Sequence, residues 1–220
     1  MAAQLGSGKP HEVAIPPLGL AGTLVVPKIA SGLVVFAHGS GSSRFSPRNT
    51  AVAQALNGRG FATLLFDLLT PREESDRANV FDISLLAERL VDVVQWLGRQ
   101  EQTIANLPLG LFGASTGAAA ALVAAARLPD RIGAVVSRGG RPDLAGDALP
   151  MVRAPTLLIV GGVDFGVIEL NETALRRLRA PKALEIVEGA THLFPEPGAM
   201  DAVIDHASRW FKQYLAKSPG

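Results

Sequence analysis

The chain has 220 residues, a formal net charge of +1 and no cysteine, and 48% of its residues are apolar. This length favours one large domain over two, and the nearly neutral charge gives no reason to expect a nucleic acid or an anionic membrane as a partner. The absence of cysteine excludes disulfides, thiolate metal sites and a cysteine nucleophile. No apolar run approaches the ~18 residues of a membrane span, so we expect a cytoplasmic protein with no membrane partner. The sequence leaves the oligomeric state open.

Strands and helices are predicted to alternate along most of the chain. Residues 1–10 are polar and glycine-rich and are expected to form a flexible leader. Apolar runs of strand length predict strands at residues 11–15, 20–26, 33–37, 61–67, 108–112, 132–137, 155–160 and 183–187. Helical patterns predict helices at residues 47–56, 83–99, 118–128, 167–178 and 203–214. The charged stretch 70–79 is interpreted as an exposed connecting loop.

This alternation favours parallel strands joined by right-handed crossovers. It predicts an α/β fold with an open, mostly parallel sheet of about eight strands, helices on both faces and a single domain over residues 11–217. Too few residues separate 137 from 155 to hold a sizeable lid. Ligands in such sheets bind beyond the carboxyl ends of the strands. The residues expected to crowd this edge are Ser40, Ser115, Arg138, Asp164 and His192.

The stretch Gly113–Ala114–Ser115–Thr116–Gly117 lies between a predicted strand and an alanine-rich predicted helix. In that context Gly-x-Ser-x-Gly is typical of a nucleophile elbow, a sharp turn that lifts a serine hydroxyl out of the sheet. The turn is expected to force Ser115 to a strained backbone conformation at a helix N-terminus. Two flanking glycines would allow strand and helix to approach closely. Ser115 is therefore the candidate nucleophile.

A serine nucleophile needs a base, and the base needs a carboxylate to orient it. His192 follows the last predicted strand by a few residues and is the candidate base. Asp164, after the preceding strand, is the favoured acid, because it completes the chain order Ser…Asp…His. Asp143 stays open as a rival acid, and Asp67 is a weaker one. His38 is expected to brace its own loop through hydrogen bonds.

An oxyanion hole requires two backbone N–H groups. Thr116, directly after the candidate nucleophile, is expected to supply one of them. Ser40 is expected to supply the other, with Gly39 and Gly41 allowing its loop to turn inward. A competing interpretation takes Gly39-x-Gly41 and Asp67 as a dinucleotide fingerprint, but Arg44 occupies the position of the third glycine.

The elbow, Gly162-x-Asp164, Ala190–Thr191–His192 and the run 38–49 (HGSGSSRFSPRN) together resemble a known family. From about residue 11 to 215 the chain resembles small, lidless serine hydrolases of the α/β-hydrolase fold, in the dienelactone-hydrolase-like branch. The resemblance implies hydrolysis of small-molecule esters without a cofactor or metal. Dienelactone hydrolase proper has a cysteine nucleophile, which this chain lacks. A non-catalytic binding protein of the same fold remains the alternative.

The substrate pocket is the least defined part of the prediction. An open, shallow site suits small soluble esters. Three arginines are candidates to bind a substrate carboxylate, with helix capping or ion pairing as the equal alternative. Apolar walls are expected from side chains that follow the strands. The candidate substrate-binding residues are Arg44, Phe45, Arg138, Arg141, Phe165 and Leu193.

Overall fold

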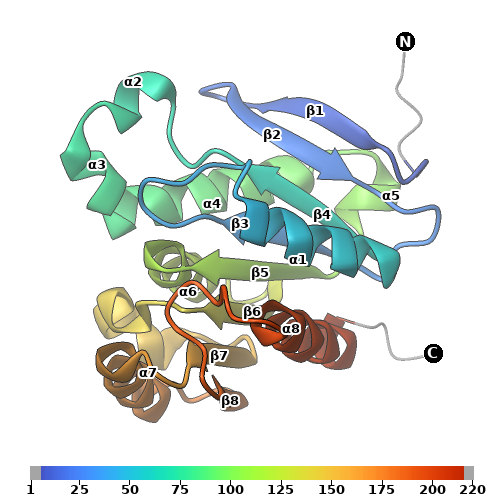
Figure 1. Cartoon of the computed structure of the whole chain (residues 1–220). Helices are drawn as coiled ribbons and strands as arrows, with labels where there is room; N and C mark the ends of the chain where they lie inside the picture. Colours follow the sequence, from blue (N-terminus) through green and yellow to red (C-terminus); the bar gives the residue numbers. More distant parts are fainter. Residues whose placement is uncertain (1–5, 216–220) are drawn as a thin grey trace.

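The structure is a computed structural model that describes residues 6–215 (Figure 1). Residues 1–5 of the predicted leader and residues 216–217 of the predicted domain lie outside this range. Within the leader, the Gly8 N–H donates to the Val26 carbonyl at 2.9 Å, and the first strand begins at Pro10. No helix in the described part of the chain is long and apolar enough to cross a membrane.

The element order follows the predicted alternation. The strands are β1 Pro10–Ile15, β2 Leu20–Val25, β3 Gly32–Ala37, β4 Phe61–Phe66, β5 Leu109–Ala114, β6 Ile132–Arg138, β7 Thr156–Gly161 and β8 Lys182–Val187. The helices are α1 Pro47–Gly58, α2 Pro71–Glu74, α3 Arg77–Phe81, α4 Ile83–Leu97, α5 Gln102–Ala105, α6 Thr116–Arg127, α7 Phe165–Arg177 and α8 Ala199–Leu215, with a 3₁₀ segment at Pro142–Met151.

All eight strands form one sheet in the order β1-β2-β4-β3-β5-β6-β7-β8. β2 pairs antiparallel with both β1 and β4, and every other pairing is parallel. The prediction of an open, mostly parallel sheet of about eight strands is confirmed. Because the parallel strands share a direction, the loops that follow them meet at one edge of the sheet.

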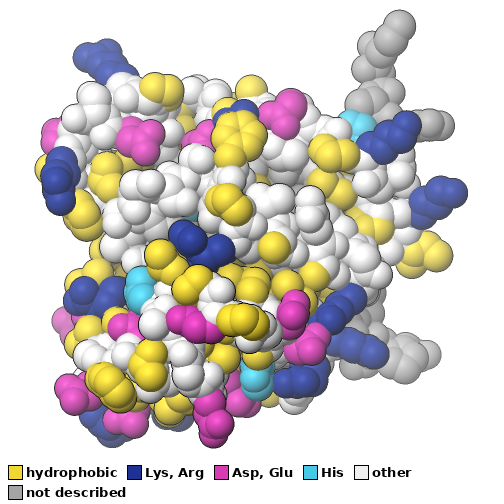
Figure 2. Space-filling model, in the orientation of Figure 1, with side chains coloured by type: hydrophobic (Ala, Val, Ile, Leu, Met, Phe, Trp, Pro, Cys, Tyr) yellow, Lys and Arg dark blue, Asp and Glu magenta, His cyan; other side chains and the backbone are white. Residues whose placement is uncertain are grey.

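Both faces of the sheet are buried, and the alternation of side chains along a strand explains how. In β3, Val34 and Phe36 pack in one core cluster, whereas Leu33 and Val35 pack in the other. The first cluster is covered by α1 and α8, and the second by α4, α6 and α7 (Figure 1). On the face shown in Figure 2, charges of both signs are interspersed, in keeping with the small net charge.

The interpretation of residues 70–79 as a plain loop is wrong. This stretch contains α2 and the start of α3. Thr70 and Glu73 form a capping box: the Thr70 hydroxyl accepts from the Glu73 N–H at 3.3 Å, and the Glu73 carboxylate accepts from the Thr70 N–H at 2.9 Å. The 3₁₀ segment and α5 were also absent from the prediction. The helices α2, α3 and α5 have only four or five residues each, and the 3₁₀ segment does not have the 3.6-residue period of an α-helix, so all four lack the apolar repeat on which the prediction depended.

Candidate active site

The elbow at Ser115 has the conformation that its glycines imply. Ser115 is the N-cap of α6 with φ +51° and ψ −123°, a region that residues other than glycine rarely occupy. A Cβ at Gly117 would overlap the carbonyl oxygens of Ala37 and His38, and one at Gly113 would overlap the backbone of Ala118. The close contact of β5, β3 and α6 therefore requires glycine at both positions. Ser115 is held, half-exposed, at the N-terminus of a buried helix.

His192 and Asp164 form a hydrogen-bonded pair at the same edge. His192 Nδ1 lies 2.7 Å from Asp164 Oδ2, and the aspartate side chain is 17% exposed. Asp164 is the N-cap residue of α7, but its side chain makes no capping bond and faces the imidazole instead. The rival acid Asp143 binds Arg141 through both carboxylate oxygens, each at 2.8 Å.

Ser115 and His192 line one pocket of about 170 Å³, together with Gly39, Ser40 and Leu193. Among the described residues there is no hydrogen bond between Ser115 Oγ and the imidazole. Such bonds are often long in ligand-free enzymes and tighten when a substrate binds. The pocket therefore brings a strained serine and a carboxylate-bound histidine together, which is the set of groups that nucleophilic catalysis needs.

The two predicted oxyanion donors lie at the same corner of the site. The Ser40 N–H donates to the Thr116 hydroxyl at 3.0 Å. Ser40 follows β3, and Thr116 is the first residue of α6, where the N–H groups have no partner within the helix. In the ligand-free site the Ser40 N–H is therefore already hydrogen-bonded to the Thr116 hydroxyl.

His38 braces the loop that carries Ser40, as the sequence indicates. Its Nε2 accepts the Leu68 N–H at 3.1 Å, so Nδ1 carries the proton and donates to the Gly39 carbonyl at 3.0 Å. Burial lowers the pKa of His38, and the Gly39 bond and nearby carboxylates offset this only in part. The neutral imidazole links the end of β3 to the end of β4.

The free energy of unfolding is expected to decrease as the pH is lowered below about 6.5, the pKa of an unperturbed histidine. The folded state holds His38 neutral, so the unfolded chain binds the proton first, and this binding stabilises the unfolded chain relative to the folded one as the pH falls. His38→Gln, whose amide oxygen can accept the Leu68 N–H, should remove up to ~1.4 kcal/mol per pH unit from the slope of unfolding free energy against pH. Urea unfolding of both proteins between pH 8 and pH 5 measures this slope. Equal slopes would contradict the prediction.

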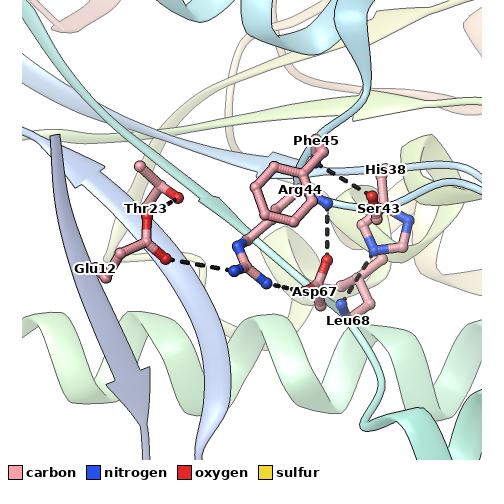
Figure 3. A network of polar contacts seen from close by, with 8 residues as sticks. All are labelled: Glu12, Thr23, His38, Ser43, Arg44, Phe45, Asp67 and Leu68. Atoms are coloured by element: carbon pink, nitrogen blue, oxygen red, sulfur yellow. Dashed lines mark hydrogen bonds and ion pairs between the residues drawn. The ribbon is translucent and has the colours of Figure 1, made fainter.

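Two of the predicted substrate-binding residues belong to a different part of the surface (Figure 3). Arg44 pairs with Asp67 at 2.5 Å and with Glu12 at 3.3 Å, and its guanidinium stacks 4.2 Å from the centre of the Phe45 ring. Arg44 and the exposed Phe45 line a separate pocket over β1, β2 and β4. The ion pair with Arg44 also engages the Asp67 carboxylate, which in the dinucleotide interpretation would bind a ribose hydroxyl.

Of the other four predicted substrate-binding residues, two line the Ser115 pocket and two do not. Arg138 and Leu193 line the Ser115 pocket. Phe165 follows Asp164 and is 70% exposed, but it is not part of the pocket lining, and Arg141 is held by Asp143. Arg48 and Asn49, which were not among the predicted site residues, also line the pocket, from the first turn of α1. Ser46 followed by Pro47 is a helix-start signal that places both residues beside the 38–46 loop.

Comparison with known proteins agrees with this fold. A family model described as the α/β hydrolase fold matches residues 32–157, and the chain belongs to this family. It is 55% identical to a dienelactone hydrolase from Anabaena variabilis, with a TM-score of 0.89 over 94% of this chain and 99% of that one. Est1E from Butyrivibrio proteoclasticus shares the fold, with a TM-score of 0.78 at 17% identity over 94% of this chain and 99% of that one.

Two proteins from Mycobacterium tuberculosis, strains CDC 1551 and H37Rv, are each 60% identical to this chain over 209 residues. Both are named "Putative phosphoribosyl transferase". The match covers 95% of this chain but only 47% of each relative, so the chain spans about half the length of these proteins.

Proposed function

We propose that the protein is a serine hydrolase that cleaves small soluble esters. The observation that carries the proposal is the His192–Asp164 hydrogen bond at 2.7 Å, beside a pocket that Ser115 also lines. Chain order, the strained elbow and the relative named a dienelactone hydrolase support the same chemistry. A cytoplasmic location stays a prediction.

In this mechanism Ser115 Oγ attacks the ester carbonyl carbon while His192 Nε2 takes the serine proton. Asp164 accepts the Nδ1–H and stabilises the imidazolium. The histidine then passes the proton to the leaving alcohol, and an acyl-enzyme remains. Water, deprotonated by the same histidine, releases the acid and restores the serine. The step needs no metal or cofactor.

The developing oxyanion would accept the Thr116 N–H and the Ser40 N–H. Because the Ser40 N–H donates to the Thr116 hydroxyl in the ligand-free site, the oxyanion must displace or share that bond. Losing the Ser40–Thr116 hydrogen bond costs little free energy, because the Ser40 N–H exchanges a neutral acceptor for the charged oxyanion. The Thr116 hydroxyl is then free to turn toward another partner.

The transferase name belongs to proteins about twice as long as this chain, and the chain itself matches the α/β hydrolase family model, which gives no support for a transferase activity. The alternative worth testing is a binding protein of the same fold that catalyses nothing.

Labelling with a fluorophosphonate, followed by peptide mapping, tests the proposal together with an ester panel graded by acyl length. We expect the label on Ser115 and turnover that favours acyl groups of about two to six carbons, because a shallow pocket cannot bury a longer tail at ~0.8 kcal/mol per CH₂. A chelator should leave the rate unchanged. If the protein neither takes the label nor cleaves any ester, the binding-protein alternative holds. A preference for long-chain emulsions would contradict the small-ester specificity.

A further inference from the structure

The Ser115 pocket contains two guanidinium groups without a carboxylate partner in the described part of the chain. Arg138, the last residue of β6, is 5% exposed, and Arg48 lies in the first turn of α1. Neither takes part in any ion pair among residues 6–215. A buried charge is costly unless an opposite charge accompanies it. This pair is therefore suited to a negatively charged ligand.

Both arginines also have hydrogen-bond donors to spare. Arg138 Nη2 donates to Asn49 Oδ1 at 3.1 Å, but Arg138 Nε is buried without a partner in the described structure, and so is Arg48 Nε. Burial, and next the charge of Arg48, lower the pKa of Arg138 to about 10. The group stays charged at neutral pH, and the two like charges face one pocket.

Two helix N-termini add positive potential at the same place. Ser46 is the N-cap of α1 and Ser115 is the N-cap of α6, and both serines line this pocket. Each helix has 12 residues and presents the positive end of its dipole to the pocket. In α1, however, Pro47 has no N–H and the Asn49 N–H donates to the Ser46 hydroxyl, so the contribution of α1 is mainly that of its dipole. Two guanidinium groups and two helix ends converge beside the candidate nucleophile.

The nearest arginines in the chain do have carboxylate partners, although Arg44 Nε is also buried without a hydrogen bond. Arg44, four residues before Arg48, is neutralised by Asp67 and Glu12. Arg141, three residues after Arg138, is neutralised by Asp143. Arg48 and Arg138 therefore differ from the nearest arginines in the chain in having no carboxylate partner among the described residues.

We propose that this pocket binds a phosphate monoester group of the substrate, with Arg48 and Arg138 as its ligands. The role in turnover rests on the proposed hydrolase function; the binding does not. A phosphate monoester carries about −1.5 to −2 charges at pH 7 and balances two guanidiniums, whereas one carboxylate would leave one of them unneutralised. Its three terminal oxygens can accept N–H groups of the two guanidiniums and the hydroxyls of Ser42 and Ser46, which line the same pocket.

Calorimetric titration in phosphate-free buffer tests the pocket directly. The titrated protein is the Ser115→Ala variant, which cannot turn over an ester, and the probes are methyl phosphate and acetate. We expect methyl phosphate to bind at least about tenfold more tightly than acetate, because it uses both guanidiniums. Adding Arg48→Gln should weaken methyl phosphate binding at least about tenfold. Arg153→Gln removes an exposed arginine near the amino end of β7 and should leave the affinity unchanged.

Arg138→Gln is expected to weaken binding as well, but this residue is buried and its loss could unfold the protein, so the half-exposed Arg48 decides the outcome. The proposal is overturned if methyl phosphate binds no more tightly than acetate, or if the Arg48→Gln and Arg153→Gln proteins bind it equally well. Failure of the hydrolase function is a separate result: the wild-type protein would cleave no ester, and the titration would still report phosphate binding.

Discussion

Ser115→Ala is expected to lower ester turnover by about 10⁴- to 10⁶-fold while the fold is retained. The serine Oγ is the only group proposed to form the covalent bond, so no other residue can take over the reaction. Stability should change little, because alanine keeps the Cβ and Ser115 makes no side-chain capping bond to α6. Turnover of 4-nitrophenyl acetate and the thermal unfolding midpoint measure the two effects.

Ser43→Ala serves as the matched control for the nucleophile. Ser43 lies in the neighbouring loop, accepts the Phe45 N–H at 3.2 Å and does not line the Ser115 pocket. Its replacement should leave turnover near that of the wild-type protein. Substantial turnover by the Ser115→Ala protein would mean that another group carries the chemistry, and the hydrolase mechanism proposed here would be wrong.

The sheet was predictable because most of its parallel strands are buried on both faces, with the edge strand β8 as the exception. The run Leu33–Ala37 is apolar without interruption and Phe61–Phe66 is interrupted only by Thr63, which is the pattern expected of a strand covered on both sides. The short helices α2, α3 and α5 were harder to predict, because little more than one helical turn contains too few residues to show a repeat. The Thr70–Glu73 capping box was nevertheless present in the sequence and could have identified α2.

The sequence predicted which residues follow the strand ends and so lie at the candidate site. It could not predict which of these residues contact one another. Asp143 and Asp164 both follow a strand, and only the structure reveals that the first binds Arg141 and the second faces His192. Sequence position alone could not distinguish Arg44 from Arg48 either.

The roles of Arg44 and Arg48 differ because of partners that are distant in the chain. Arg44 forms ion pairs with Glu12, 32 residues away, and with Asp67, 23 residues away. Arg48 is four residues further on and lines the pocket instead. A substrate pocket is assembled from such long-range contacts, which leave no local pattern in the sequence.

His192→Ala should impair turnover as severely as Ser115→Ala, and the double variant should be no worse than either, because the two residues act in one proton transfer. Asp164→Asn should lower kcat by about 10⁴-fold. The asparagine amide can donate to Nδ1, which favours the imidazole tautomer that cannot accept the serine proton. Asparagine is also a good helix N-cap, so α7 should remain intact.

Asp143→Asn is the control that distinguishes the two acids. This substitution breaks the ion pair with Arg141, whose side chain is 38% exposed, so the loss of the pair should cost little stability. It leaves the 2.7 Å hydrogen bond between His192 and Asp164 in place. We therefore expect near-normal kcat for Asp143→Asn beside a loss of several orders of magnitude for Asp164→Asn, both measured on 4-nitrophenyl acetate at one pH. The reverse pattern would assign the orienting carboxylate to Asp143. It would also require His192 to exchange partners when the substrate binds, since in the ligand-free site Asp143 has both oxygens on Arg141.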